Sequence, residues 1–197
     1  MSRFIENKAR EHIDDPDSVK SGIARLLVSA SEQYRRVFGE INLDLPEGVI
    51  RLPDLTIGGV KPKELDKLLN TNGRRVSDYA EDLMNKMPTL KQKQVISPVI
   101  ATPSVMGLTG VPTTEQIYER ADKLNWDLCP AEIGPHLVLA FNNETAYKDL
   151  SIKFPIRIGM KQVADRYGLP DVFELDRRDG SLWLRASWAL PSAPSRH

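Results

Sequence analysis

The sequence WDLCPAEIGPHLVLAF, residues 126–141, decides how the C-terminal half of this chain folds. It contains the only cysteine of the protein and one of its three histidines. A helix over 114–124, with apolar residues at intervals of three and four, leads into it. Pro135 disfavours a helical conformation at Gly134, so the apolar run 137–141 is predicted to be a short buried strand.

A β-hairpin is predicted near the C-terminus, where Asp179-Gly180 separates two runs of strand-forming residues. A two-residue turn at this position places Glu174 opposite Arg185. Because side chains alternate along a strand, one face collects the residues expected in the core. These are Phe173, Leu175, Leu182, Leu184, Ala186 and Trp188. The opposite face collects Val172, Glu174, Asp176, Trp183, Arg185 and Ser187.

Trp183 therefore lies on the polar face of the hairpin, between acidic and basic neighbours. With Glu174 and Arg185 it forms the candidate binding surface. Two interpretations remain open: another segment of the chain covers the indole, or the indole anchors a partner protein or a second copy. Tryptophan is enriched among the residues that carry binding energy.

The rest of the sequence predicts mainly helices first and then strands. The predicted elements are a helix over 19–38, a short edge strand over 49–52, helices over 63–70 and 77–87, strands over 95–101 (interrupted by Pro98) and 151–160, and a helical turn over 161–167. Elements in this order favour an α+β fold, with a helical N-terminal part packed on a small, mainly antiparallel sheet that has one intervening helix.

The expected organisation has three parts. Residues 1–62 supply an N-terminal helix and an irregular segment, 63–190 form an α+β domain, and 191–197 form a disordered tail. A single compact domain is the alternative, since 197 residues suit one domain.

Composition excludes several classes of protein. The 27 basic residues balance the 27 acidic ones, so a general affinity for nucleic acid is not expected. A single cysteine cannot form an intramolecular disulfide, and no apolar run approaches the length of a membrane span. A soluble, cytoplasmic protein with no membrane contact is the expectation.

The sequence also lacks the common motifs for cofactors and metals. It has no Walker-type phosphate loop, no G-x-G-x-x-G after a strand and no G-x-S-x-G elbow. Two of the three histidines, His12 and His197, lie near the chain ends. No cofactor and no metal site is therefore expected.

Cys129, Glu132 and His136 are the candidate catalytic residues. A thiol activated by a nearby imidazole would act as a nucleophile, with the carboxylate as a general base. The competing interpretation is that Cys129 is a small buried apolar residue between Leu128 and Pro130.

The two helices over 63–87 surround a short turn with Gly73, which also fits a DNA-binding helical hairpin. The second helix offers mainly acidic side chains to solvent, whereas helices that read DNA usually show Arg, Lys, Asn or Gln. Nucleic acid binding is therefore not expected.

Three stretches carry a resemblance to a known family. They are VSDYAEDLM (76–84), TEQIYERA continuing through LCPAEIGP (114–135), and VF with DGSLWLRA (172–186). They resemble a family of uncharacterised proteins encoded in the genomes of uncultivated bacterial lineages, over residues 64–188. The resemblance implies that this range forms one unit, and it implies no catalytic residue.

Three functions follow in order of preference. The first is a non-enzymatic binding or accessory module that contacts a protein partner or self-associates. The second is a small hydrolase or transferase that uses Cys129, Glu132 and His136. The third is a DNA-associated protein that uses the helices over 63–87.

Overall fold

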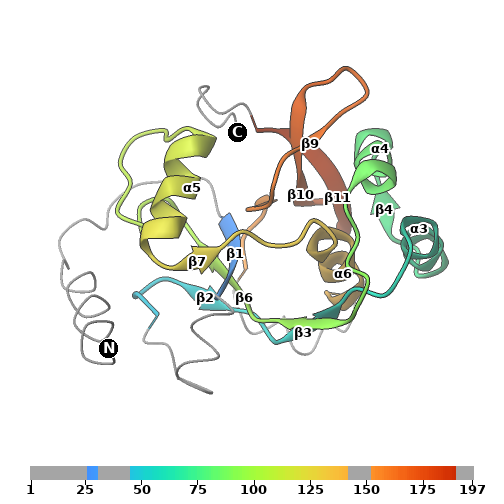
Figure 1. The fold of residues 1–197 in the computed structure, drawn as a ribbon, viewed down its shortest axis with the longest axis horizontal. Coiled ribbons are helices and arrows are strands. Elements are labelled where there is room, and N and C mark those ends of the chain that lie inside the picture. Colours follow the sequence, from blue (N-terminus) through green and yellow to red (C-terminus); the bar gives the residue numbers. More distant parts are fainter. Residues whose placement is uncertain (1–25, 31–44, 142–151, 190–197) are drawn as a thin grey trace.

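The protein has an α+β fold in which helices pack against a sheet of mostly antiparallel strands (Figure 1). The structure, a computed structural model, describes residues 26–30, 45–141 and 152–189. Its helices in these ranges are α3 (Pro62–Thr71), α4 (Asp78–Lys86), α5 (Thr114–Lys123) and α6 (Ile133–Ala140). The predicted α+β class is confirmed.

The large sheet follows the order β2-β6-β1-β8-β10-β11-β4, with β7 added to β1 and β9 added to β10. Its described strands are β1 (Leu26–Ala30), β2 (Ile50–Arg51), β4 (Arg75–Val76), β6 (Pro98–Ala101), β7 (Trp126–Asp127), β8 (Ile156–Ile158), β9 (Val163–Ala164), β10 (Pro170–Arg178) and β11 (Ser181–Trp188). Only the β1–β8 and β11–β4 pairs among these strands are parallel. β3 (Leu55–Ile57) and β5 (Gln94–Ile96) form a separate antiparallel pair.

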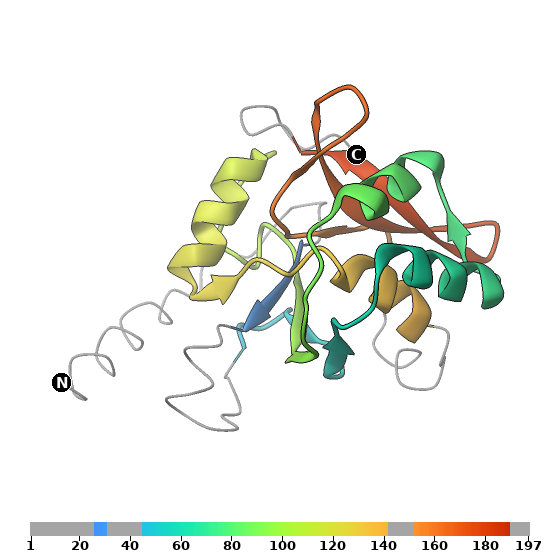
Figure 2. The same cartoon turned by 45° about the vertical axis from the view of Figure 1, so that its right-hand side comes forward.

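The helices divide into two groups around this sheet. α3, α4 and α6 lie together beside the β10–β11 hairpin, whereas α5 lies at the other end of the molecule next to β7 (Figures 1 and 2). The main core unites apolar residues of α3, α4 and α6 with Phe173 and Leu184 of the hairpin. A smaller cluster joins Ile117 and Ala121 of α5 to Val99 of β6.

The hairpin has the predicted register. Asp179 and Gly180 both have positive φ, 49° and 73°, as a type I′ turn requires, and Glu174 lies opposite Arg185. Four of the six residues predicted for the core face are buried: Phe173, Leu175, Leu182 and Leu184. Trp188 is 56% exposed, so its placement in the core was wrong: it lies in the last position of β11, beyond the helices that cover this face.

Residues 133–140 form helix α6, so the predicted strand over 137–141 was wrong. Pro135 is the third residue of α6, where a backbone N–H has no acceptor within the helix. Gly134 has no Cβ to clash with the proline ring, which removes part of the restriction on the residue before a proline. A Cβ at this position would lie 3.0 Å from the Phe173 side chain, so glycine also permits close packing of α6 on β10.

The predicted helix over 19–38 is wrong at its centre. Residues 26–30 form β1, which pairs with β6, β7 and β8 inside the large sheet. The remainder of that prediction, and the predicted tail 191–197, lie outside the described residues. The predicted helical turn over 161–167 is also wrong, because Val163–Ala164 form β9.

Other local predictions are confirmed. Ser77 caps α4 by accepting a hydrogen bond from the Ala80 N–H, and Thr113 and Gln116 form a capping box on α5. β2 is an edge strand. The interruption predicted at Pro98 is real: β5 ends at Ile96 in the small sheet and β6 begins at Pro98 in the large one.

Candidate functional site

The polar face of the hairpin carries the three residues predicted to bind a partner, and two of them are engaged in ion pairs. Arg185 Nη1 lies 3.0 Å from Asp176 Oδ2, and Arg178 Nε lies 2.7 Å from the same oxygen. Glu174 Oε2 lies 3.8 Å from Arg157 Nη2 on the neighbouring strand β8. Arg185 thus pairs diagonally with Asp176 rather than with Glu174, the residue opposite it.

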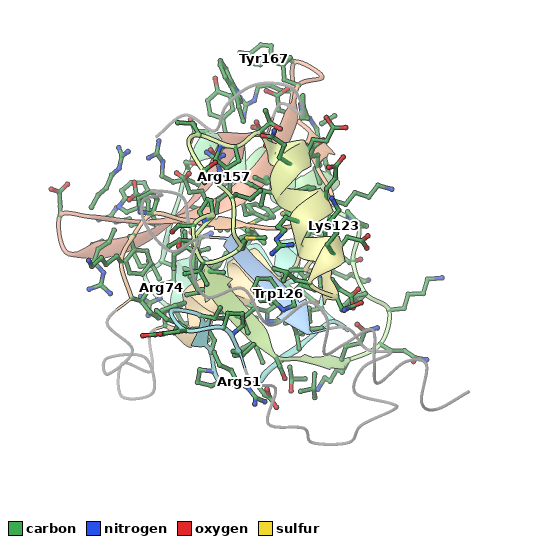
Figure 3. All side chains as sticks on the ribbon, turned by 90° about the vertical axis from the view of Figure 1, so that its left-hand side faces the viewer. Arg51, Arg74, Lys123, Trp126, Arg157 and Tyr167 are labelled. Atoms are coloured by element: carbon green, nitrogen blue, oxygen red, sulfur yellow. The ribbon has the colours of Figure 1, made fainter. Side chains whose placement is uncertain are left out.

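These ion pairs stabilise the charged forms of their members. Burial raises the pKa of the Asp176 carboxyl, but hydrogen bonds from Arg178 and Arg185 outweigh burial and hold that pKa below its ordinary value. Arg157 lies near the centre of the molecule in Figure 3, and its Nη2 donates to Ser187 Oγ at 2.8 Å. The face is therefore largely a network of mutually paired charges.

Trp183 is half-buried beside this network. Arg75 of β4, the strand that pairs with β11 at this position, lies over the indole with its Cζ 5.9 Å from the ring centroid. The indole is thus partly covered by a neighbouring strand of the same chain, one of the two interpretations left open by the sequence. The partner that covers it comes from β4, between the two helices of the 63–87 hairpin.

The structure places the candidate catalytic residues near one another in the chain but in separate contacts. Cys129 is 3% exposed, and its backbone N–H donates to Gly159 O in a bridge between Cys129 and Met160. Glu132 immediately precedes α6, and its Oε2 accepts the Leu90 N–H at 3.1 Å.

The helix brings Glu132 and His136 to one side, four residues apart, although no helix was predicted here. Burial lowers the pKa of the His136 imidazole and raises that of the Glu132 carboxyl. Within the described ranges, Glu132 Oε1 and His136 Nε2 have no hydrogen-bond partner. A hydrogen bond between Nε2 and a nucleophile, as a general base at this nitrogen would make, is therefore not present in the described ranges.

A second cluster of titratable groups lies where α4 meets the start of β10. It consists of Asp82, Asp165 and Asp171, here called the carboxylate cluster. Asp165 is 4% exposed and Asp171 is 1% exposed. Asp82, on α4, binds Lys86 with its Oδ2 2.9 Å from the Lys86 Nζ.

Asp165 organises the turn between β9 and β10. Its Oδ1 accepts the N–H groups of Tyr167 and Leu169, each at 2.8 Å, while its Oδ2 has no partner in the described part of the chain. Such side-chain bonds to nearby backbone N–H groups are how aspartate holds a tight turn. The turn thereby fixes Tyr167 and Leu169 in place.

The carboxyl group of Asp171 has a raised pKa. Burial, with the negative charges of Asp165 and Asp82, raises its pKa to about 6. Its Oδ1 has no hydrogen-bond partner among the described residues. The low-dielectric surroundings and the neighbouring carboxylates both disfavour its ionised form.

Large exposed side chains lie on the same elements as the carboxylate cluster, or directly opposite them. Together with Arg166 they form what is here called the Tyr167 surface: Tyr79 (45% exposed), Tyr167 (71%), Leu169 (40%) and Trp188 (56%). Arg166 lies over the Tyr79 ring, its Cζ 5.0 Å from the centroid, and its Nη2 donates to Asp78 O. Tyr167 projects at one end of the molecule in Figure 3.

The sequence argument missed this site because its members come from three separate stretches of chain. Tyr79 and Asp82 share one side of α4, the turn supplies 165–169, and Trp188 ends β11. Asp171 begins β10 and lies directly opposite Trp188. The alternation that placed Trp188 on the core face also places Asp171 there, and an acid at a core position was the available signal.

Searches among family models, curated proteins and solved structures found no match to this chain. In the described residues there is no group of three or more His, Cys, Asp or Glu side chains that could hold a metal ion. None of the described helices is both long enough and apolar enough to span a membrane.

Proposed function

We propose that this protein is a non-enzymatic binding module that docks a partner protein on the Tyr167 surface. The single observation that supports this most is the exposure of Tyr79, Tyr167, Leu169 and Trp188 around one turn. Tyrosine, tryptophan and arginine dominate the residues that carry binding energy at protein interfaces. Their exposure next to one another matches an interaction patch better than a random surface.

The surface is also held in position before any partner arrives. The Asp165 side chain fixes the turn, and Arg166 ties the turn to α4 through Asp78 O and the Tyr79 ring. A preformed surface loses little conformational entropy on binding, which favours affinity.

The alternatives have weaker support. A hydrolase or transferase at Cys129 requires a thiol–imidazole contact, whereas His136 Nε2 has no hydrogen-bond partner in the described part of the chain. A DNA-associated function would need a basic stripe on α4, yet the helix carries Asp78, Glu81 and Asp82 against one lysine, Lys86.

A random-peptide phage library panned on the immobilised wild-type protein tests the proposal. Recovered peptides are resynthesised and titrated against Tyr167→Ala, Trp188→Ala and the control Val111→Ala. Val111 is as exposed as Trp188 and lies in the segment before α5, outside the Tyr167 surface. Binding that is lost by the first two variants and kept by the control supports the proposal. Failure to recover any peptide that depends on Tyr167 or Trp188 overturns it.

Self-association is tested alongside. If a second copy is the partner, sedimentation velocity will show a dimer in the wild type that Tyr167→Ala reduces to a monomer. A monomeric wild type directs the search to a different protein.

A further inference from the structure

The Tyr167 surface lies over two buried carboxyl groups, those of Asp165 and Asp171. In the described residues, no ion pair reaches Asp165 or Asp171. The nearest basic side chain of the turn, Arg166, is instead engaged with the Tyr79 ring and Asp78 O. The surface therefore combines aromatic side chains with buried acids that have no ion pair in the described part of the chain.

Two oxygens beneath this surface lack partners. Asp165 Oδ2 and Asp171 Oδ1 are both buried, and neither finds a hydrogen-bond donor within the described ranges. A buried carboxylate oxygen without a donor is unfavourable, because water that would solvate it has been removed. Both oxygens are covered by the fold, so a ligand at the surface meets their negative charge rather than the atoms themselves.

The chemical class of a ligand that these acids would attract can be deduced by exclusion. The carboxylates repel phosphate groups, which disfavours a nucleic acid or an anionic lipid headgroup. A metal ion is disfavoured because the described residues contain no group of three or more suitable ligands. Organic cations remain, and Asp82 already binds one, the ammonium of Lys86.

Resting on the function proposed above, we infer that the partner is a protein segment with a lysine or arginine side chain flanked by apolar residues. Its cation is directed at the carboxylate cluster of Asp82, Asp165 and Asp171. Its apolar residues contact Tyr167, Leu169 and Trp188, and the exposed aromatic rings attract the cation through their negative faces. The cation pairs with Asp82, the partly exposed member of the cluster, while Asp165 and Asp171 attract it from beneath and the turn keeps its position.

The peptides that depend on Tyr167 provide the probe. Their lysine and arginine content is compared with that of the unselected library, and each basic peptide is resynthesised with glutamine in place of the basic residue. Affinities are measured by fluorescence anisotropy at low and high salt against Asp82→Asn, Asp171→Asn and the control Asp122→Asn. Asp122 is exposed on α5, at the other end of the molecule.

Enrichment in basic residues is expected, with a tenfold or greater loss of affinity on Asp82→Asn or on the lysine-to-glutamine change, and none on Asp122→Asn. Asp82 is partly exposed on α4, so its variant tests the inference even where Asp171→Asn perturbs folding. Peptides that need Tyr167 but contain no excess of lysine or arginine overturn the inference and leave the binding function standing. Peptides whose affinity for Asp82→Asn and Asp171→Asn equals their affinity for the wild type also overturn the inference and leave the binding function standing.

Discussion

Asp171 and Trp188 lie directly opposite each other on β10 and β11, yet the aspartate is 1% exposed and the tryptophan is 56% exposed. This reverses the usual distribution, in which acids face water and large aromatic side chains are mostly buried. The reversal occurs where the core ends, beside α4 and the 165–169 turn. An acid buried at this end of the hairpin lowers the stability of the fold, a cost that is common at functional sites.

Asp171→Asn is expected to stabilise the protein at neutral pH. The pKa of Asp171 is about 6 in the folded state and about 3.9 in the unfolded state. The folded state therefore binds more protons between these values, so wild-type stability falls as pH rises through that window. The variant removes up to about 3 kcal/mol of this cost at pH 7.

Urea unfolding at pH 4, 5, 6 and 7 measures this effect. The gain from Asp171→Asn should be smallest at pH 4 and largest at pH 7. A variant that is less stable than wild type at pH 7 would show that the Asp171 carboxylate is favourably solvated in the native protein.

Asp176→Asn should have the opposite pH dependence. Ion pairs with Arg178 and Arg185 depress the pKa of Asp176. Its carboxylate therefore stabilises the folded state above the pKa of the unfolded state, and this stabilisation is lost as pH falls through the pKa of the folded state. The free energy of unfolding of the variant is expected to be about 1–3 kcal/mol lower than that of the wild type at pH 7. The difference from wild type should shrink below about pH 4, whereas Asp122→Asn should change stability little at any pH.

Gly134→Ala tests the packing of α6 on β10. The added Cβ would lie 3.0 Å from the Phe173 side chain, closer than ordinary contact. Alanine favours a helix more than glycine does, but overpacking costs about 1–3 kcal/mol, so the net expectation is destabilisation. Thermal unfolding measures it, and Gly134→Ala combined with Phe173→Leu should recover part of the loss if the clash is the cause.

Trp183→Ala is expected to leave the fold intact. The indole is half-buried and contacts Arg75, so the free energy of unfolding should fall by about 1–2 kcal/mol. Deletion of an aromatic side chain from the core would lower it by ~3–5 kcal/mol. Chemical denaturation followed by circular dichroism provides the measurement. A loss in the larger range would mean that Trp183 belongs to the core, and a loss of peptide binding would extend the binding surface to this face.

Cys129 should react slowly with thiol reagents in the native protein. Its side chain is 3% exposed, and a buried thiol in apolar surroundings is inert. The rate of labelling at pH 7.5, compared with that of the urea-unfolded protein, checks this expectation. Rapid labelling of the folded protein would revive the hydrolase or transferase alternative.

Local patterns predicted part of this fold well. The hairpin follows from Asp179-Gly180, because two consecutive positive φ angles are needed and these residue types permit them. The caps at Ser77 and Thr113 follow from side chains that satisfy N–H groups a few residues away. Each of these features is decided by atoms within about one turn of chain.

The prediction failed where packing overrides local preference. Residues 26–30 carry a helical spacing of apolar residues, yet β6 and β8 pair with them on both sides. Hydrogen bonds to two neighbouring strands outweigh a helical propensity of roughly a few tenths of a kcal/mol per residue. No pattern in the sequence near residue 26 reports those neighbours.

By itself, the sequence determined the α+β class, three of the four described helices and the register of the hairpin, because these depend on short-range periodicity and turn chemistry. Tertiary structure alone decided that 133–140 are helical, that 26–30 enter the sheet, and that Asp82, Asp165 and Asp171 meet beneath Tyr167. The carboxylate cluster depends on contacts between residues as far as 89 positions apart, from Asp82 to Asp171. Side chains that distant become neighbours only through folding, so the raised pKa of Asp171 and the unpartnered oxygens of Asp165 and Asp171 have no signature in the linear chain.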